Sequence, residues 1–320
     1  MASRVLSIQS HVVAGYVGNR AATFPMQYAG LDVDVINTVQ LSNHTGYQSI
    51  KGKVFEGSHI TELFQGLQEN KLDDYDFVLT GYMGKADNVN AVSQVVSELK
   101  KKNNDVFFLL DTVLGDYGEL YVPIELVELY KTVLCPLANL VTPNQFEAET
   151  ISGTKIKTLD DAVNVCSYFH DLGVKNVIIT STTLEDDNHD SMLHMIGSQI
   201  SADSDSPKMF KISFPFLTGY FTGAGDLLCA LILSRIAERP TKSTLFNENE
   251  LKHICESALA SQHLILTATA DHQKKSGIPA PPGLNQSQMS SALVRSFELQ
   301  LIPNRAHIVN PKIEFLATDI

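Results

Sequence analysis

Residues 221–226 read Phe-Thr-Gly-Ala-Gly-Asp, and residues 227–233 directly after them read Leu-Leu-Cys-Ala-Leu-Ile-Leu. The apolar run predicts a helix, and the glycines before it let the backbone come close to a ligand. The first amides of a helix have no intrahelical partner and carry partial positive charge, so they can bind an anion. Asp226 should stay ionised at neutral pH and could accept a proton from a substrate hydroxyl. Phosphoryl transfer uses this combination, although an ordinary loop with an N-capping Asp also explains the six residues.

Composition restricts the class of protein. The chain has 320 residues, of which 44% are hydrophobic, and this length allows one large α/β domain or two smaller ones. We expect a single domain over residues 1–320. The 36 acidic residues exceed the 24 basic ones, giving a net charge of −12, which disfavours nucleic-acid binding. No run of about 18 apolar residues exists, so no membrane span is expected.

The four cysteines and the N-terminus indicate the compartment. Cys135, Cys166, Cys229 and Cys255 are widely spaced, as expected for buried thiols in a reducing compartment. The N-terminus lacks the long apolar region of a signal peptide. We therefore expect a cytoplasmic protein, with the nucleus as an alternative location.

Apolar runs of strand length alternate with amphipathic stretches through the first half. The runs are residues 5–8, 33–36, 77–79, 106–110, 140–141 and 177–179. Continuous apolar strands separated by helices predict a mostly parallel sheet covered on both faces. Each run is followed by polar or small residues: Gln9-Ser10, Asn37-Thr38, Thr80-Gly81, Asp111-Thr112, Thr142-Pro143-Asn144 and Thr180-Ser181. Ligands bind beyond the carboxyl ends of such strands, so these residues predict one active-site cleft.

The second half has a different pattern. Residues 192–196 and 209–214 predict a β-hairpin, and residues 227–237, 251–269 and 290–299 predict helices. Residues 271–282 are rich in Gly, Pro, Ser and Lys and predict a surface loop. Any small subdomain should arise from residues 39–54.

Two polar clusters lie in the N-terminal part. Residues 9–19 follow the first strand and carry two glycines before a helix, but without the Gly-x-Gly-x-x-Gly of dinucleotide folds. Ser10 could bond a small ligand, or the segment could be a turn with a cap. Residues 42–47 read Ser-Asn-His-Thr-Gly-Tyr and could line a pocket. A lone His is more often structural than catalytic, so His44 is assigned no chemical step.

Two further clusters could serve a metal–nucleotide complex. Asp111 and Asp116 flank a turn after a strand, and Mg²⁺ is commonly held by one or two carboxylates plus phosphate oxygens. A solvated loop is the simpler explanation of the same pair. Asn144 and Glu147 begin a predicted helix after Pro143, where capping accounts for them economically. Alternatively, both face the nucleotide and its metal.

Six motifs resemble the ribokinase-like superfamily and, within it, the pyridoxal kinases. They are residues 7–25, 42–47, 79–82, 113–116, 142–147 and 223–226, which follow one another in the order of the family and cover nearly the whole chain. A sugar kinase of the superfamily would share the last motif but not the first two. The resemblance implies a three-layer α/β/α ribokinase-like fold with a central, mostly parallel sheet. It also implies transfer of the ATP γ-phosphoryl group to the 5′-hydroxymethyl group of pyridoxal, pyridoxine or pyridoxamine, as in vitamin B6 salvage.

The resemblance also implies a role for individual residues. Asp226 corresponds to the general base, and the amides of Gly223, Ala224 and Gly225 to the anion hole. The positions that match substrate contacts are Ser10, Val17, Leu41, Thr45 and Tyr82. Those that match ATP contacts are Asn144, Thr180, Ser181, Leu217, Thr218, Gly219, Thr222, Gly223 and Ala224.

Cations and a partner are implied in the same way. Magnesium, or another divalent cation, would accompany ATP, and K⁺ or Na⁺ would bind as a monovalent cation. The matching positions are Asp116, Asp111, Thr142 and Glu147. Relatives form homodimers, and we expect the same here.

The chain departs from the family pattern at three positions. Thr112 replaces a Pro that often follows the first Asp of the metal loop, so this loop should be slightly more mobile. Leu41 stands where some relatives carry Phe, which removes an aromatic contact to the pyridine ring. Ala224 stands where many carry Thr, which removes a hydroxyl near the phosphates while leaving the amide.

Three other functions compete with this prediction. A related hydroxymethylpyrimidine kinase is the nearest rival enzyme, and the regions of Ser10 and Thr45 favour a pyridoxal-type ring over it. A catalytically silent vitamer-binding protein would not need Asp226 and Asp116. A nicotinamide-dependent oxidoreductase lacks its glycine fingerprint and is the weakest of the three.

Overall fold

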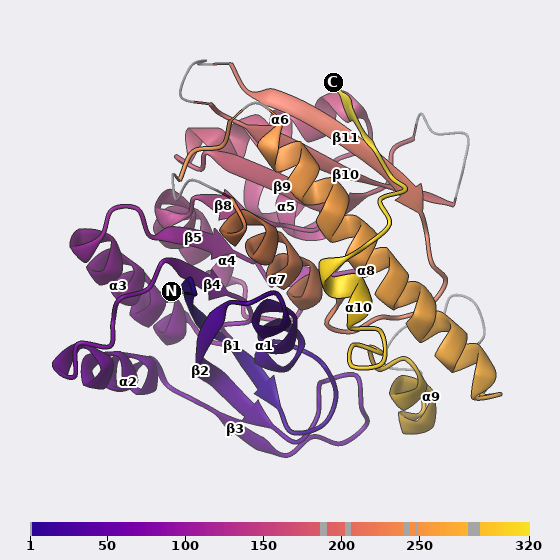
Figure 1. Cartoon of the computed structure of the whole chain (residues 1–320), viewed down its shortest axis with the longest axis horizontal. Coiled ribbons are helices and arrows are strands. Elements are labelled where there is room, and N and C mark those ends of the chain that lie inside the picture. The colour runs from indigo at the N-terminus through magenta and orange to yellow at the C-terminus, as the bar shows by residue number, and fades with distance from the viewer. Residues whose placement is uncertain (1, 186–190, 202–205, 240–243, 248, 281–288) are drawn as a thin grey trace.

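One ten-stranded sheet runs through the computed structural model, which describes residues 2–185, 191–201, 206–239, 244–247, 249–280 and 289–320 (Figure 1). Its order is β12-β11-β10-β9-β8-β5-β4-β1-β2-β3. The six neighbouring strands β2, β1, β4, β5, β8 and β9 are parallel to one another. Strand β3 pairs antiparallel with β2 at one edge, and β10, β11 and β12 pair antiparallel at the other. The strands are β1 (Arg4–Val12), β2 (Asp32–Leu41), β3 (Gly52–Val54), β4 (Phe77–Thr80), β5 (Phe107–Leu110), β8 (Leu140–Val141), β9 (Asn176–Thr182), β10 (Met192–Gln199), β11 (Lys208–Pro215) and β12 (Ala317–Asp319).

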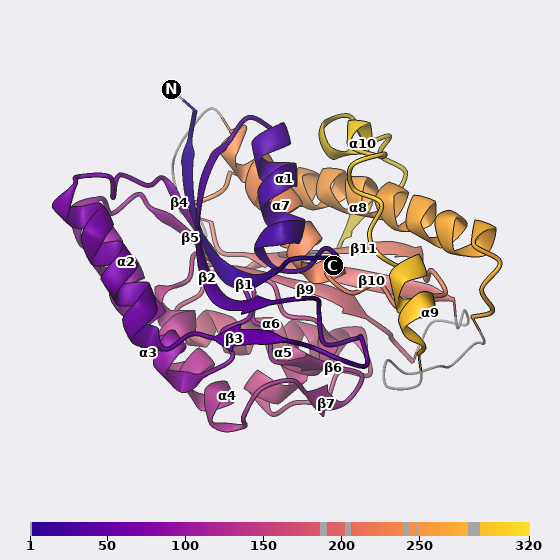
Figure 2. The same cartoon turned by 90° about the horizontal axis from the view of Figure 1, so that it is seen from below.

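Helices cover both faces of this sheet, as Figure 2 shows from below. One face carries α1 (Asn19–Tyr28), α7 (Ala224–Ala237), α8 (Glu250–Lys275) and α10 (Ala306–Val309). The other carries α2 (Gly57–Glu69), α3 (Ala86–Lys102), α4 (Glu125–Leu129), α5 (Gln145–Ser152) and α6 (Leu159–Asp171). The π-helical turn η1 (Tyr130–Leu134) and the 3₁₀ turn η2 (Cys135–Leu137) follow α4, and α9 (Ser291–Ser296) lies beside α8. The predicted three-layer α/β/α fold is confirmed.

The central strands are apolar throughout because each contributes to two cores. In β5, Phe107 and Leu109 belong to the core under α7 and α8, whereas Phe108 and Leu110 belong to the core under α3 and α6. Successive side chains of a strand point to opposite faces, so a strand covered on both sides buries every residue. The four cysteines are free thiols buried in these cores, as their spacing predicted.

The second half follows its sequence pattern with two differences. The hairpin is confirmed, since β10 and β11 pair antiparallel from Met192–Pro215 to Gln199–Lys208, and its residues 202–205 lie outside the described ones. The surface loop expected over residues 271–282 was wrong for its first five residues, because α8 continues to Lys275. Gln273 is buried there and Lys274 and Lys275 favour the helix C-terminus; residues 281–282 are not described.

Residues 39–54 extend the main sheet. Val39, Gln40 and Leu41 pair with the antiparallel edge strand β3. Helix α9 is shorter than the predicted residues 290–299, and Ser290 caps its N-terminus by accepting the amide of Leu293 at 3.2 Å.

The strand order reverses between β1 and β4. From β1 the chain first moves to β2 and β3 on one side, then returns to β4, β5, β8 and β9 on the other. In open parallel sheets a crevice for ligands forms where the order reverses, at the carboxyl ends of the strands. Ser10 near the end of β1 and Thr80 at the end of β4 therefore flank the expected ligand site.

We predict that Phe107→Ala lowers the free energy of unfolding by about 3–5 kcal/mol, the usual cost of removing a buried Phe ring. Phe107 is 2% exposed, and its ring lies 6.3 Å from that of Phe77 and 5.8 Å from that of Phe246. Equilibrium urea unfolding measures the loss. Phe216→Ala, at a ring that is 45% exposed, is the control. Equal losses in both variants would contradict the position of Phe107 in this core.

Candidate active site

Gly223, with a φ of 84°, is the N-cap of helix α7, and it lies against Tyr16 and Val17 near the N-terminus of the chain. The Ala224 amide donates to the Phe221 carbonyl at 3.2 Å, so this amide is used in the turn. Gly225 is exposed, and a Cβ added to it would meet nothing within 4 Å. The first-turn amides of Gly225 and Asp226 have no acceptor within the helix. They are the groups at this end that an anion could reach.

Two glycines hold the start of α7 against the end of β1. A Cβ at Gly223 would lie 2.0 Å from the Tyr16 carbonyl oxygen, and one at Gly18 would lie 2.1 Å from the Ser10 carbonyl oxygen. Neither site has room for a side chain, and Gly18 also has a positive φ of 51°. The two glycine-bearing segments, about 200 residues apart in the chain, thus form one surface.

Asp226 is the carboxylate of this surface. Burial raises its pKa to about 6, and the backbone amide of Gly18 opposes that rise. The group is therefore mostly ionised at neutral pH, as the sequence predicted. The pKa is higher than a helix N-terminus alone suggests, because the effect of desolvation outweighs that of the favourable amides.

Ser10 lies on β1 and Tyr82 follows β4, the two strands that flank the reversal of strand order. The pairing of β1 with β2 shifts register between Gln9 and Ser10, and such irregularities redirect side chains near sites. The Ser10 Oγ lies beside Gly18, within 2.3 Å of where a Cβ would stand. Tyr82 follows β4, is half-buried, and its carbonyl accepts the Thr38 hydroxyl at 2.7 Å. The two predicted substrate positions thus lie at the same end of two adjacent strands.

Glu298 joins two of the predicted substrate segments, and the sequence did not reveal it. It accepts hydrogen bonds from the Tyr16 amide at 3.1 Å, the His44 ring at 3.1 Å and the Tyr47 hydroxyl at 2.8 Å. His44 is a hydrogen-bonded structural residue here, as predicted. The sequence shows no signal for Glu298, because its partners are more than 250 positions away.

Buried carboxylates follow β5 and begin α5. Burial raises the pKa of Asp111 well above its ordinary value, and the charges of Glu147 and Asp226 raise it further. Burial also raises the pKa of Glu147, although its hydrogen-bond donors oppose this. The charges of Glu147 and Asp226 thus act on Asp111, and a nearby cation would relieve this repulsion.

Both oxygens of Glu147 accept hydrogen bonds. The donors are the amides of Leu114 at 2.9 Å, Gly115 at 3.4 Å and Asn144 at 3.0 Å, and the Thr112 hydroxyl at 3.0 Å. The capping box of Asn144 and Glu147 is present, which favours the capping interpretation for this pair. Thr112 is fully buried and its hydroxyl bonds Glu147, and the extra mobility expected at this departure from Pro stays a prediction.

Asp116 lies on a two-stranded hairpin made of β6 (Gly115–Asp116) and β7 (Glu119–Leu120). Burial raises its pKa, and the Tyr117 amide, which donates to it at 2.8 Å, lowers it. The Tyr121 hydroxyl lies 3.4 Å from that of Tyr220, which joins the hairpin to the segment before Gly223. In the part of the chain that the structure describes, no three His, Cys, Asp or Glu side chains are already arranged to hold a metal.

The positions predicted for ATP lie along the same rim. Asn144 caps α5 and donates to the Gly115 carbonyl at 2.8 Å, and the Thr180 amide on β9 donates to the Pro143 carbonyl at 2.9 Å. Thr142, with its hydroxyl 3.2 Å from the Cys229 sulfur, is buried against α7. Ser181 lies next to Thr180 on β9, and residues 217–219 follow β11. Nucleotide contact at these positions stays a prediction.

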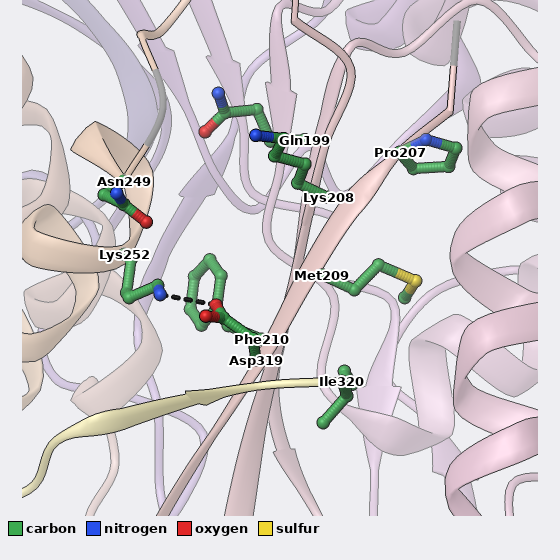
Figure 3. A pocket seen from close by; sticks show the side chains of 9 residues that line it. All are labelled: Gln199, Pro207, Lys208, Met209, Phe210, Asn249, Lys252, Asp319 and Ile320. Atoms are coloured by element: carbon green, nitrogen blue, oxygen red, sulfur yellow. Dashed lines mark hydrogen bonds and ion pairs between the residues drawn. The ribbon is translucent and has the colours of Figure 1, made fainter. Parts of the chain in front are cut away.

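A pocket lies away from this rim (Figure 3). It is lined by Gln199, Pro207, Lys208, Met209, Phe210, Asn249, Lys252, Asp319 and Ile320. Gln199 pairs with Asn176 at the amino end of β9, so the pocket is at the opposite end of the sheet. Lys252 forms an ion pair with Asp319, and the Gln199 amide donates to the carbonyls of Phe246 and Asn247. These contacts are structural, and none involves a residue predicted for the active site.

Known proteins resemble the chain over its whole length. A family model described as phosphomethylpyrimidine kinase matches residues 31–245. The pyridoxal kinase of Arabidopsis thaliana is 40% identical over 314 residues, covering 98% of this chain and 94% of that protein. The pyridoxal kinase of Homo sapiens is 38% identical, covering 98% of each. A solved structure of Leishmania donovani pyridoxal kinase in complex with ADP and pyridoxine has a TM-score of 0.85 and 32% identity, covering 99% of both chains.

We predict that Gly223→Ala destabilises the chain by about 2–4 kcal/mol, since a left-handed non-Gly residue costs about 1–3 kcal/mol and the Tyr16 carbonyl adds a clash. Gly153→Ala is a matched control, because Gly153 has a φ of 75° but no atom within 4 Å of the added Cβ. Gly153→Ala should lower the free energy of unfolding only by the conformational cost of a positive φ, about 1 kcal/mol. Urea unfolding of both variants measures this, and equal losses would contradict the close contact at Gly223.

Proposed function

The chain belongs to the pyridoxal kinase family, and from that premise we propose that it uses ATP to phosphorylate the 5′-hydroxymethyl group of pyridoxal, pyridoxine and pyridoxamine. The product with pyridoxal is pyridoxal 5′-phosphate. The observation that carries this proposal is the contact of Gly223 and Asp226 with residues 10–18 where the strand order reverses. It brings a base, an anion site and a predicted ring-binding segment together.

Asp226 acts as the general base in this proposal. Its carboxylate accepts the proton of the 5′-hydroxyl as that oxygen attacks the γ-phosphorus, and the bond from the γ-phosphorus to the β–γ bridging oxygen breaks. A pKa of about 6 leaves the group ionised at pH 7 and still basic enough to take the proton. The transferring group carries negative charge throughout, so its neutralisation is as important as the base.

The start of α7 supplies part of that neutralisation. We assign the anion hole to residues 223–225, with the exposed, uncrowded Gly225 as its most open member. The Ala224 amide already donates to Phe221, so it would have to be shared or released to contact a phosphate. Ala224 also has no hydroxyl to add to the site.

Magnesium would offset the negative charge of ATP and of the carboxylates. Asp116 and Asp111 are the residues we assign to it, with Glu147 and Thr142 placed behind them; this fits the raised pKa values of Asp111, Asp116 and Glu147. When bound, the divalent ion would supply electrostatic stabilisation of the transferring phosphoryl group. Because all four donors of Glu147 point to its oxygens, we assign it to holding the metal loop in place. A monovalent cation near Asp111 and Thr142 belongs to the same proposal.

The substrates would lie on either side of Asp226. We assign the contacts to the pyridine ring to Ser10, Val17, Leu41, Thr45 and Tyr82. ATP would extend along the rim of β8 and β9, against Asn144, Thr180, Ser181, Thr222 and residues 217–219. The positions of Ser10 on β1 and of Tyr82 just after the adjacent β4, and of Asn144 and Thr180 on the next part of the rim, support this division.

A homodimer in the cytoplasm, or also in the nucleus, is part of the proposal. Strand β3 forms an outer edge of the sheet, and Val13, Ile50 and Val54 near it are 66%, 37% and 40% exposed. Exposed apolar side chains gathered beside a sheet edge are commonly covered by a partner. The free buried thiols suit a reducing compartment. Among the described residues, no helix is both long and apolar enough to cross a bilayer.

A hydroxymethylpyrimidine kinase is the second candidate, because the matching family model is described as phosphomethylpyrimidine kinase. That match starts at residue 31 and leaves out residues 10–18, whereas the similarity to pyridoxal kinases includes them. A silent vitamer-binding protein has no specific observation in its favour.

We predict ADP release that depends on pyridoxal in a coupled assay with MgATP and K⁺. Turnover with pyridoxal should exceed that with hydroxymethylpyrimidine, and omission of magnesium should abolish it. ADP at background level with every vitamer would overturn the proposed activity. Faster turnover of hydroxymethylpyrimidine would favour the second candidate.

We predict that Asp226→Asn loses about a hundred- to ten-thousand-fold in kcat, the usual contribution of a positioned base. Pyridoxal should still bind, which calorimetry can measure. Because folding raises the pKa of Asp226, protonated Asp226 favours the folded state and ionised Asp226 opposes it. This contribution to the free energy of unfolding is lost as the pH rises through about 6. The Asn variant should therefore be at least as stable as the wild type at pH 7.5, so lost activity would not reflect unfolding. An unchanged kcat would remove Asp226 from the mechanism.

We also predict that kcat/KM for pyridoxal falls as the pH drops through about 6, because protonated Asp226 cannot accept the hydroxyl proton. Below that pH the decrease should approach tenfold per unit, and the residual activity of Asp226→Asn should lack this step. A wild-type profile that is flat between pH 5 and 7 would show that a different group accepts the proton.

A further inference from the structure

We propose that Glu298 is a positioning residue of the vitamer site, in which one carboxylate fixes both segments that contact the pyridine ring. The two segments are residues 15–18, between β1 and α1, and residues 42–47, after β2. This inference rests on the proposed function for the identity of the substrate. The hydrogen-bond arrangement itself does not depend on it.

The two oxygens of Glu298 are divided between the segments. Oε2 accepts the amide of Tyr16 at 3.1 Å. Oε1 accepts both the His44 Nε2 at 3.1 Å and the Tyr47 hydroxyl at 2.8 Å. The side chain is only 13% exposed, so the three donors replace water as its partners. A charged acceptor with three donors is among the stronger hydrogen-bond arrangements in proteins.

The backbone fixes which nitrogen of His44 carries the proton. The Gly46 amide donates to His44 Nδ1 at 3.1 Å, so Nδ1 must be the acceptor. A neutral ring then carries its hydrogen on Nε2, which is the atom that faces Glu298. His44 is 5% exposed and thus acts as a rigid link between Glu298 and the backbone of the 42–47 segment.

The charge of Glu298 is maintained in this environment. Burial alone would raise its pKa, but His44, Tyr47 and the Tyr16 amide together lower it below its ordinary value. Burial and Glu298 raise the pKa of Tyr47, so the phenol stays a donor. At neutral pH the centre is therefore one carboxylate with three donors.

The residues that Glu298 holds are neighbours of the predicted ring contacts. Thr45, which is exposed, lies between His44 and Gly46, and both of these are fixed by hydrogen bonds. On the other segment, Tyr16 precedes Val17 and Gly18, and the Gly18 amide acts on Asp226. In the described structure the carboxylate of Glu298 bonds Tyr16, His44 and Tyr47 rather than Thr45 or Asp226, so it acts through these neighbours.

The backbone beside Glu298 is anchored to the glycine segment before α7. The Phe297 ring packs edge-on against Phe221 at 5.6 Å, and Leu299 is fully buried. At Gly15 a Cβ would lie 2.6 Å from Glu298 Oε1, so this glycine lets the carboxylate approach the 15–18 segment. The segment 297–299 therefore holds its carboxylate at a fixed position between the two ring-contact segments.

Glu298→Gln tests the inference with a side chain of the same shape. An amide offers one oxygen and one donor nitrogen, so at least one of the three donors must face an N–H group. We expect KM for pyridoxal to rise about tenfold or more, as for a lost hydrogen bond to a charged group. The KM for ATP and kcat should change by less than about threefold, since no assigned nucleotide contact or base is altered. Tyr47→Phe, which removes one donor, should give a smaller rise in the same direction.

Glu256→Gln is the matched control. Glu256 is 6% exposed and accepts the Ala317 amide at 2.8 Å, so it is a buried carboxylate with a backbone donor at β12. Its replacement should affect the free energy of unfolding and leave KM for pyridoxal unchanged. An equal rise of KM in both variants would reduce the effect to general destabilisation and overturn the inference.

Hydrogen exchange separates this inference from the proposed function. Peptides covering residues 13–19 and 42–48 should exchange faster in Glu298→Gln than in the wild type, without any substrate present, and the Glu256→Gln variant should not change them. Unchanged exchange in those peptides overturns the inference whatever the wild type phosphorylates. If the wild type does not turn over pyridoxal but Glu298→Gln exchanges faster in those peptides, the proposed function is wrong. The positioning of both segments by Glu298 is then still supported.

Discussion

The close contact between Gly223 and the Tyr16 carbonyl is the constraint on which the site depends. A Cβ at position 223 would lie 2.0 Å from that oxygen, and the φ of 84° there already favours glycine. Through this contact the N-terminus of α7 meets the segment that follows β1, at the point where the strand order reverses. Asp226 then lies beside Gly18, which packs against Ser10, so the proposed base is next to a predicted substrate segment.

Burying several carboxylates near one another in this site costs electrostatic free energy. Asp111, Glu147 and Asp226 lie close enough that the pKa of Asp111 is raised by the charges of the other two as well as by burial. Such a cluster opposes folding of the ion-free chain at neutral pH and favours the binding of a cation. A kinase that works with a magnesium nucleotide can use this, because the metal and the substrate charge complete the site together. Glu147, saturated by its own donors, keeps the loop in shape before either arrives.

Local patterns sufficed to predict the layers and the rim but not the side-chain networks. The apolar strands, the polar residues after them and the glycines at 223 and 225 are short-range signals, and the structure has them where expected. Glu298 could not be found this way, since its donors are distant in sequence. The raised pKa of Asp226 depends on burial by other segments. The buried Thr112 and the longer α8 likewise follow from tertiary contacts, with Glu147 and around Gln273.

The central claim is that Asp226 is the group that receives the substrate proton. A crystal structure of the chain with pyridoxal and a non-hydrolysable ATP analogue tests it most directly. The account predicts a 5′-hydroxyl oxygen within about 3.2 Å of the Asp226 carboxylate, with the γ-phosphate near the amides at the start of α7, since a general base must lie within hydrogen-bond reach of the proton it takes. A pyridoxal ring bound with its 5′-hydroxyl far from Asp226, or next to another carboxylate, would contradict it.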